Sequence, residues 1–154
     1  MIEVFELSAL LISFFLVVAD QAAKLWIART MSIGESIPVL SGIFHITYIQ
    51  NPGAAFGMFA DQRWMFIVAG IAVIAAACSM RRRLADAPTM ARWGAALLLG
   101  GAAGNLIDRV RIGRVIDFFD FRVWPVFNIA DIGICVGVGC LIYALYRDGK
   151  RERE

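Results

Sequence analysis

The sequence predicts an all-α integral membrane protein with four transmembrane helices and a small extracytoplasmic β-rich cradle. Hydrophobic residues make up 60% of the 154 residues and charged residues only 18%, whereas soluble domains have roughly 45–50% apolar and about 25% charged residues. Apolar stretches recur four times, and two segments between them are rich in β-branched and aromatic residues. This composition disfavours a disordered chain, a nucleic-acid-binding protein and a soluble enzyme.

The four apolar stretches have lengths close to that of a membrane span. A transmembrane helix needs about 20 mostly apolar residues, with a range near 17–25. Segments 64–80 and 123–146 meet this length directly, whereas 7–19 and 93–107 meet it only with polar residues at one end included. We therefore expect one membrane-embedded domain, 1–154, with spans at about 7–28, 64–80, 93–109 and 125–146 and outer loops 29–63 and 110–124.

The basic residues predict the orientation. Glu3 and Glu6 precede the first span and no Lys or Arg occurs before Lys24, so we expect a retained helix and not a cleaved signal peptide. Lys and Arg in short loops favour the cytoplasm. No acid is directly adjacent to the run Arg81–Arg83, whereas the arginines of the opposite loops lie among acids. Both termini are therefore expected in the cytoplasm.

The two outer loops carry patterns of extended structure. Residues 37–50 (IPVLSGIFHITYIQ) are rich in β-branched and aromatic residues, and 51–57 (NPGAAFG) supplies a turn. Residues 114–124 (RVIDFFDFRVW) also suggest extended or irregular backbone. We expect a small outer β element lying on the membrane surface.

Polar residues gather at one depth of the predicted bundle. Such groups are costly within a membrane and are therefore candidates for function. With both termini inside, four segments bring their polar residues to the outer face: Asp20, Gln21, Lys24, Asn105, Asp108, Arg109, Asp117, Asp120, Asn128 and Asp131. Offsets of three and four residues place several on shared helix faces, namely Asp20 with Lys24, Asn105 with Asp108 and Arg109, and Asn128 with Asp131. Scattered helix contacts would not concentrate in this way.

Histidine and cysteine offer little chemistry. His45 is the single histidine, so neither a His-based triad nor a multi-His metal site can be assembled, and we assign it to an outer strand. Cys78, Cys135 and Cys140 lie in apolar segments without metal-ligand spacing, which is typical of packing residues.

Two glycine pairs have the spacing of closely packed membrane helices. Gly100 with Gly104, and Gly133 with Gly137, form small-xxx-small patterns. These residues would also leave room for a substrate segment beside the polar layer.

The carboxylates remain as catalytic candidates. Two carboxylates held close together cannot both ionise, so one keeps a proton. Such a pair can activate water and protonate a leaving amine. Asp131 is the best first member, and its partner could be Asp117, Asp108 or Asp20. Spacing does not choose among them, although Asp108 beside Arg109 could be ion-paired, which slightly favours Asp117.

Three alternatives stay open at this point. The acids could form interfacial ion pairs only, Asp108 with Arg109 and Asp117 with Arg114. A transporter or channel subunit would spread polar residues along a path through the membrane, but the inner halves of all four spans lack charge. A Ser–Lys hydrolase would pair Lys24 with Ser13 or Ser41, whereas a structural Lys24 would pair with Asp20 or extend to the interface.

Five sequence blocks together carry a family resemblance. They are DQAAK at 20–24, NPGAAFG at 51–57, GGAAGNLIDR at 100–109, VIDF at 115–118 and WPVFNIAD at 124–131. In this order the chain resembles the bacterial lipoprotein signal peptidase family, also called signal peptidase II. The first block alone is weak, but GGAAGNLIDR followed by VIDF and FNIAD is highly specific. The resemblance runs from the first span to the last, and no position that the family's pattern requires departs from it.

The resemblance implies a four-helix aspartyl endopeptidase of the bacterial plasma (inner) membrane with an outer β-cradle. It implies removal of the signal peptide from diacylglyceryl-modified prolipoproteins, by cleavage before the lipidated Cys. It also implies no metal or cofactor, and sensitivity to the cyclic peptide globomycin. Diacylglyceryl-prolipoproteins and membrane lipid are the expected partners, and nothing in the sequence demands a nucleic acid or more than a monomer.

The resemblance also implies roles for individual residues. The family's catalytic aspartates fall on Asp117 and Asp131, which selects Asp117 as the partner that spacing left open. Its substrate-binding residues fall on Asn51, Asn105, Arg109 and Asn128, and its supporting residues on Asp20, Lys24 and Asp108.

Overall fold

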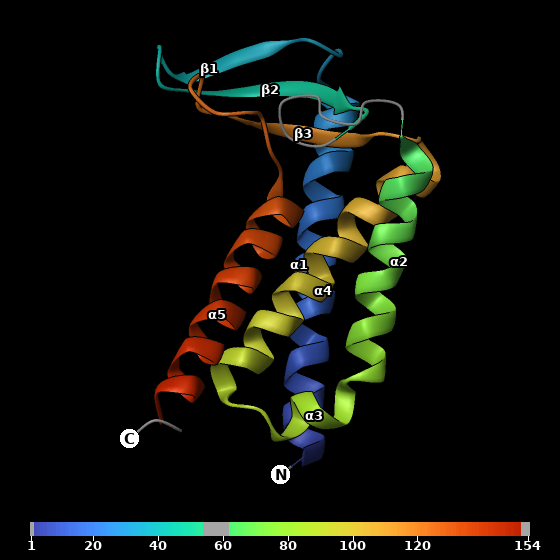
Figure 1. The fold of residues 1–154 in the computed structure, drawn as a ribbon. Helices are drawn as coiled ribbons and strands as arrows, with labels where there is room; N and C mark the ends of the chain where they lie inside the picture. The colour runs from blue at the N-terminus through green and yellow to red at the C-terminus, as the bar shows by residue number, and fades with distance from the viewer. Residues whose placement is uncertain (1, 54–61, 152–154) are drawn as a thin grey trace.

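The computed structural model describes residues 2–53 and 62–151, with side chains described for 7–53 and 62–150. Its elements are α1 (Ile2–Thr30), β1 (Ser36–Leu40), β2 (Phe44–Asn51), α2 (Arg63–Ser79), α3 (Arg81–Asp86), α4 (Thr89–Arg111), β3 (Val115–Asp120) and α5 (Ile129–Arg151). The sheet lies across one end of a helical bundle, and the start of α1, the short α3 and the end of α5 lie at the other end (Figure 1). The mostly helical fold with a small sheet is confirmed. Residues 54–57 of the predicted turn lie outside the described residues.

Two of the helices pass a length and composition test for a membrane span. They are Leu7–Thr30 within α1 and Ile129–Lys150 within α5. α2 is apolar but shorter, at 17 residues. Large apolar side chains such as Phe14, Phe15 and Leu145 are exposed on the outside of the bundle. A soluble monomer rarely exposes so much apolar surface, so this exterior fits a lipid environment.

Glycine allows α4 to pack closely against its neighbours. A Cβ built on Gly137 of α5 would lie 2.6 Å from the carbonyl oxygen of Gly94 on α4, and a Cβ on Gly94 would lie 2.7 Å from the carbonyl oxygen of Gly137. On the α1 side, a Cβ on Gly100 would lie 2.9 Å from the carbonyl oxygen of Ser13. The close approach predicted from the glycine spacing is therefore confirmed, because these contacts leave no space for a methyl group.

The sheet is antiparallel, in the order β1–β2–β3. Its attachment to the bundle is a small apolar core in which Ile27 and Met31 of α1 pack with Tyr48, Ile116 and Phe118. Residues 37–50 are thus extended as predicted, as a hairpin whose turn lies at 41–43. In the β2–β3 register, Ile49 lies opposite Asp117, which brings the end of β2 to the polar layer.

α5 begins at Ile129, a few residues beyond Pro125, because Asn128 caps it. The Asn128 Oδ1 accepts the backbone N–H of Asp131 at 2.9 Å, and the Asp131 Oδ2 accepts the backbone N–H of Asn128 at 3.2 Å. This reciprocal pair satisfies two N–H groups of the helix terminus. The cap therefore fixes Asp131 in the first turn of α5, at the sheet end of the bundle.

Alanine substitutions at two glycines of α5 test the α4–α5 packing. Gly137→Ala should destabilise the protein by about 1–3 kcal/mol, because the methyl group overlaps the backbone of α4. Gly139→Ala is the matched control, since a Cβ there meets nothing within 4 Å, and alanine favours helix by about 1 kcal/mol over glycine. Thermal unfolding in detergent measures both. Equal melting temperatures for the two variants would contradict the close packing.

Candidate active site

A cavity of about 460 Å³ lies where β3 and the end of α4 meet the start of α5. Two carboxylates line it, those of Asp117 and Asp131. Its other polar lining side chains are Asn51, Asn105 and Arg109. Apolar residues complete the wall: Val115, Trp124, Pro125, Val126, Phe127, Ile132, Ile134, Cys135 and Val136. Both carboxylates predicted from the sequence therefore face the same space.

Asp117 is a nearly buried carboxyl group held by two amides. It lies on β3 and is 2% exposed. Its Oδ1 accepts a hydrogen bond from the Asn128 Nδ2 at 2.6 Å, and its Oδ2 accepts one from the Asn51 Nδ2 at 3.0 Å. Burial, followed by the nearby Asp131 carboxylate, raises the pKa of Asp117 to about 7, against the lowering effect of the two amide hydrogen bonds. This carboxyl group can therefore hold a proton near neutral pH.

Asp131 has a different environment. Its Oδ1 accepts the Asn105 Nδ2 at 2.7 Å, and its Oδ2 takes part in the α5 cap. Its position in the first turn of α5 places it at the positive end of the helix dipole, which favours a negative charge. Asn128 contacts both carboxylates, with its side-chain amide on Asp117 and its backbone N–H on Asp131.

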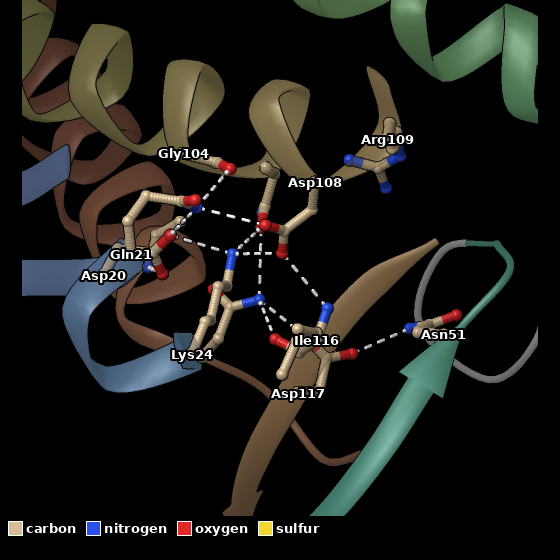
Figure 2. Close-up of polar contacts among 12 residues, drawn as sticks. Asp20, Gln21, Lys24, Asn51, Gly104, Asp108, Arg109, Ile116 and Asp117 are labelled. Carbon is tan, nitrogen blue, oxygen red and sulfur yellow. Dashed lines mark hydrogen bonds and ion pairs between the residues drawn. The ribbon is translucent and has the colours of Figure 1, made fainter. Parts of the chain in front are cut away.

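Behind the cavity, Lys24 forms the centre of a buried polar cluster (Figure 2). Its Nζ lies 2.8 Å from the Asp20 Oδ2 and 2.9 Å from the Asp108 Oδ2, and it donates to the Asn105 Oδ1 at 2.9 Å. A lysine ammonium can only donate, so the Asn105 oxygen must face it. The Asn105 Nδ2 is then directed at Asp131, which makes the orientation of that amide a consequence of Lys24.

The same cluster ties the elements together through backbone contacts. The Asp20 Oδ1 accepts the N–H of Ala130 at 2.9 Å, which links α1 to the start of α5. The Asp108 Oδ2 accepts the N–H of Ile116 at 3.1 Å, which links α4 to β3. Gln21 donates to both acids and to the carbonyl of Gly104. The neighbours of Asp117 and Asp131 along the chain are thus both anchored to this cluster.

Arg109 approaches the cavity from the end of α4. Its guanidinium lies over the ring of Phe66 at 4.6 Å from the centroid, and its Nη2 is 3.4 Å from the Gly53 carbonyl oxygen. Arg63 of α2 donates to the carbonyl oxygens of Arg109 and Val110, at 2.8 and 2.9 Å. These bonds satisfy carbonyls at the C-terminal end of α4 that have no helical partner.

The structure separates the predicted acids into two groups. Asp117 and Asp131 face the cavity, whereas Asp20 and Asp108 pair with Lys24. Asp108 does not pair with its sequence neighbour Arg109 but with Lys24, across the bundle. Asp120 binds Arg122 and Thr47 on the sheet and does not line the cavity. All of the predicted substrate-binding and supporting residues lie in or directly behind this one site.

The contacts of Ser13 weigh against a Ser–Lys site. Ser13 donates to the carbonyl oxygens of Ala96 and Ala9, at 2.7 and 3.1 Å, and Ser41 lies in the β1–β2 turn. The Lys24 Nζ is held by two carboxylates and an amide oxygen. A Ser–Lys hydrolase needs the lysine nitrogen beside a serine hydroxyl to take its proton, and no serine is among these three partners.

Three contributors to the site were not predicted. The sequence assigns Gln21 no role beyond its polarity, although its position beside Asp20 indicates a contact, which the structure contains. Nothing in the sequence signals that Arg63 caps α4, or that the backbone of Ile116 binds Asp108, because both contacts depend on tertiary packing.

The cavity offers oxygen and nitrogen donors from Asp, Asn and Arg side chains. Among the side chains described, at 7–53 and 62–150, no group of three or more His, Cys, Asp or Glu residues is arranged to hold a metal ion. The three cysteines are free thiols. The cavity instead offers two carboxylates, amide donors and one guanidinium.

Comparisons with known proteins give consistent similarities. Residues 12–147 match the family model described as "Signal peptidase (SPase) II". A protein of Halothermothrix orenii named "Lipoprotein signal peptidase" is 42% identical over 87% of this chain and 92% of its own length. One of the same name from Moorella thermoacetica is 43% identical over 94% of this chain and 97% of its own. A solved "Bacterial membrane enzyme structure" has a TM-score of 0.88 and 36% identity, covering 96% of this chain and 92% of that one.

Removing Lys24 tests whether the buried cluster holds the site together. In Lys24→Met, the buried Asp20 and Asp108 lose their cation, so the variant should be less stable by about 3–5 kcal/mol. Arg29→Met removes an exposed cation from the last turn of the same helix and should change stability by less than about 0.5 kcal/mol. Denaturant unfolding in detergent compares them. A Lys24 variant as stable as the control would show that the cluster does not anchor the bundle.

Proposed function

The chain belongs to the signal peptidase II family, and we propose that it is an aspartic endopeptidase which removes the signal peptide from diacylglyceryl-modified prolipoproteins, cutting before the lipidated Cys. The observation that carries this proposal is the convergence of Asp117 and Asp131 on one cavity, with Asn128 bonded to both. The shared name of its relatives, lipoprotein signal peptidase, supports the substrate class.

We propose that all four long helices span the bacterial inner membrane. At 1.5 Å per residue, the 17 residues of α2 and the 23 residues of α4 extend about 26 and about 35 Å, comparable to a hydrocarbon core of about 30 Å. The basic α3 and both termini would then lie in the cytoplasm, and the sheet and cavity at the extracytoplasmic face. A substrate whose lipid is confined to the bilayer would meet the cavity at this depth.

Asp117 and Asp131 have different surroundings, and these give the two carboxylates different roles. Asp117, on a buried strand, holds the shared proton near neutral pH because burial and the second carboxylate raise its pKa. Asp131 carries the negative charge, since the start of α5 and the amide of Asn105 favour the anion. Two carboxyl groups whose environments push their pKa values apart can act as an acid and a base.

The reaction follows from these roles. Asp131 takes a proton from a water molecule as the water oxygen attacks the scissile carbonyl carbon, and Asp117 gives its proton to the carbonyl oxygen. The resulting diol collapses when Asp131 returns its proton to the amide nitrogen. The C–N bond then breaks and Asp117 regains a proton from a diol hydroxyl. Carboxylates and water suffice for each step.

Other parts of the cavity fit a lipidated peptide. Arg109, Asn51 and Asn105 line the cavity and would orient the substrate backbone. Asn128, which is fully buried, would act on the substrate through its hydrogen bonds to Asp117 and Asp131. The apolar wall continues along α5 past Asp131 through Ile132, Cys135 and Val136, residues on the outer side of the helix that is exposed to lipid. Acyl chains could follow this wall into the bilayer. We propose that the protein acts as a monomer and that globomycin is its inhibitor.

Carboxylate-to-amide substitutions test the catalytic pair. Asp117→Asn and Asp131→Asn should each lower kcat by about 10³-fold or more, because each removes an acid or base. Asp120→Asn makes the same change three residues along β3, outside the cavity, and should keep most of its activity. The assay follows cleavage of a diacylated prolipoprotein in detergent by gel shift, with melting temperatures to confirm folding.

The same assay separates the chemistry from the substrate class. Unmodified prolipoprotein should be cleaved far more slowly than the diacylated form. Normal turnover by a folded Asp117 or Asp131 variant would refute the pair, whereas equal processing of both substrates would refute the lipid requirement.

The pH dependence tests the position of the proton. The pKa of Asp117 is raised to about 7, so the pair keeps its proton below that pH and loses it above. With both carboxylates ionised, nothing protonates the carbonyl oxygen, and kcat/KM should fall about tenfold per pH unit above 7. In Asn51→Ala, loss of an amide bond to the ionised Asp117 should move this decline to higher pH. A rate independent of pH up to 9 would contradict the assignment.

A further inference from the structure

Arg109 brings a positive charge to a cavity that also contains two carboxylates. The carboxylates of Asp131, Asp117 and Asp108 all attract this guanidinium. Among the side chains that the structure describes, however, Arg109 forms no ion pair, and in Figure 2 it stands apart from the cluster around Lys24. Its position is therefore set by contacts of another kind.

The start of α2 holds Arg109 by both its side chain and its backbone. The guanidinium carbon Cζ lies 4.6 Å from the centroid of the Phe66 ring. Arg63, three residues earlier on α2, donates to the carbonyl oxygen of Arg109 at 2.8 Å. Farther along α2, a Cβ on Gly70 would lie 3.4 Å from Leu106, one turn before Arg109. Arg63, Phe66 and Gly70 share one helix face at offsets of three and four residues, so the packing of α2 on α4 places the ring against the guanidinium.

An aromatic ring suits a guanidinium that has to bind a ligand. The ring attracts the face of the planar cation, whereas the five N–H donors lie in the plane and point outward from its edge. The Nη2 of Arg109 is 3.4 Å from the Gly53 carbonyl oxygen, which is long for a hydrogen bond. A carboxylate would instead engage the donors at the edge, often two at a time. The contact with Phe66 thus fixes the cation without using the donors at its edge.

The position of Arg109 also affects the proton of the carboxylate pair. A cation beside a carboxylate lowers its pKa, whereas the pKa of Asp117 is raised to about 7. The other charged side chains around the pair and Arg109 are Lys24 and Asp20 of α1, Asp108 of α4 and Arg63 of α2. Lys24 is fixed by two aspartates, and Arg63 by backbone carbonyls of α4. Arg109 is therefore the cation whose distance from the pair can change.

We propose that Phe66 is a positioning residue for substrate binding. Its ring holds Arg109 against α2 and away from Asp117 and Asp131, and the edge of the guanidinium then binds a carbonyl oxygen of the substrate backbone. This inference rests on the proposed peptidase function. Phe66 is not among the described residues that line the cavity, so it acts through Arg109. Without the ring, Arg109 would move to the two carboxylates, where an ion pair would occupy its donors and favour loss of the shared proton.

Replacement of the ring by an aliphatic side chain tests this role. Phe66→Leu and Phe66→Met stay apolar but lose the attraction for Arg109, so KM for diacylated prolipoprotein should rise about fivefold. Phe66→Tyr keeps the ring and should give a KM within about twofold of the wild type. Phe15→Leu makes the same change on the outside of α1, where Phe15 is exposed, and should leave KM unchanged. Melting temperatures in detergent confirm that the variants are folded.

A carboxyl titration gives a readout that does not depend on cleavage. The carboxyl carbon-13 NMR signal of Asp117, assigned with Asp117→Asn, reports the pKa of this group in the full chain in detergent. In Phe66→Leu this pKa should fall by about one pH unit, because Arg109 approaches the carboxylates. The decline of kcat/KM with rising pH should then begin at a correspondingly lower pH. Phe66→Tyr and Phe15→Leu should keep the wild-type titration.

These measurements separate the role of Phe66 from the peptidase function. An unchanged KM or an unchanged pKa of Asp117 in the folded ring-free variants would overturn the proposed role, and so would equal changes in Phe15→Leu. A wild-type protein that leaves diacylated prolipoprotein uncut would refute the peptidase function instead. In that case the titration alone decides whether Phe66 holds Arg109 away from the carboxylates.

Discussion

The buried ammonium of Lys24 is the interaction on which the rest of the site depends. A charge removed from water is costly unless it is paired, and Lys24, only 1% exposed, meets Asp20, Asp108 and Asn105 within 3 Å. Each partner has a second contact: Asp20 with the start of α5, Asp108 with β3, and Asn105 with Asp131. The contacts that compensate the buried charge of Lys24 therefore also fix the positions of β3 and α5, which carry Asp117 and Asp131.

This arrangement explains why aspartates at the same depth of the bundle have different partners. Asp20 and Asp108 lie against a fixed cation and serve as anionic anchors. Asp117 and Asp131 lie on the other side of Asn105 and Asn128, where amides replace the cation as partners. An amide stabilises a carboxylate less than an ammonium does, which fits the proposed mechanism, in which this pair exchanges a proton. Asn105 and Asn128 thus lie between the ion cluster around Lys24 and the two carboxylates of the cavity.

Local patterns in the sequence were sufficient for some of these features and not for others. The spacing of Asp20 and Lys24 predicted a contact that the structure contains, and the composition of 37–50 predicted extended backbone, which the structure contains as β1 and β2. The turn between these strands, at 41–43, was not predicted. The start of α5 could have been found from Asn128 and Asp131, whose spacing is that of a capping box before an apolar run. The sequence pattern could not decide whether Asp117 or Asp108 is the partner of Asp131. That choice depends on the register of β3 and on a lysine from another helix. Spacing within a segment carries no information about either.

The glycines of α4 also help to fix the start of α5. A Cβ on Gly104 would lie 2.7 Å from the Asp20 Oδ2, so glycine is what lets that carboxylate reach both Lys24 and the start of α5. One turn earlier, Gly101 lies against the backbone of Ala130. In a bilayer, apolar helices gain little by excluding water, and close packing has to hold them. The first turn of α5 is therefore fixed by hydrogen bonds on one side and by backbone contact on the other. A carboxylate in that turn can keep its place against Asp117 in a membrane that offers it no other support.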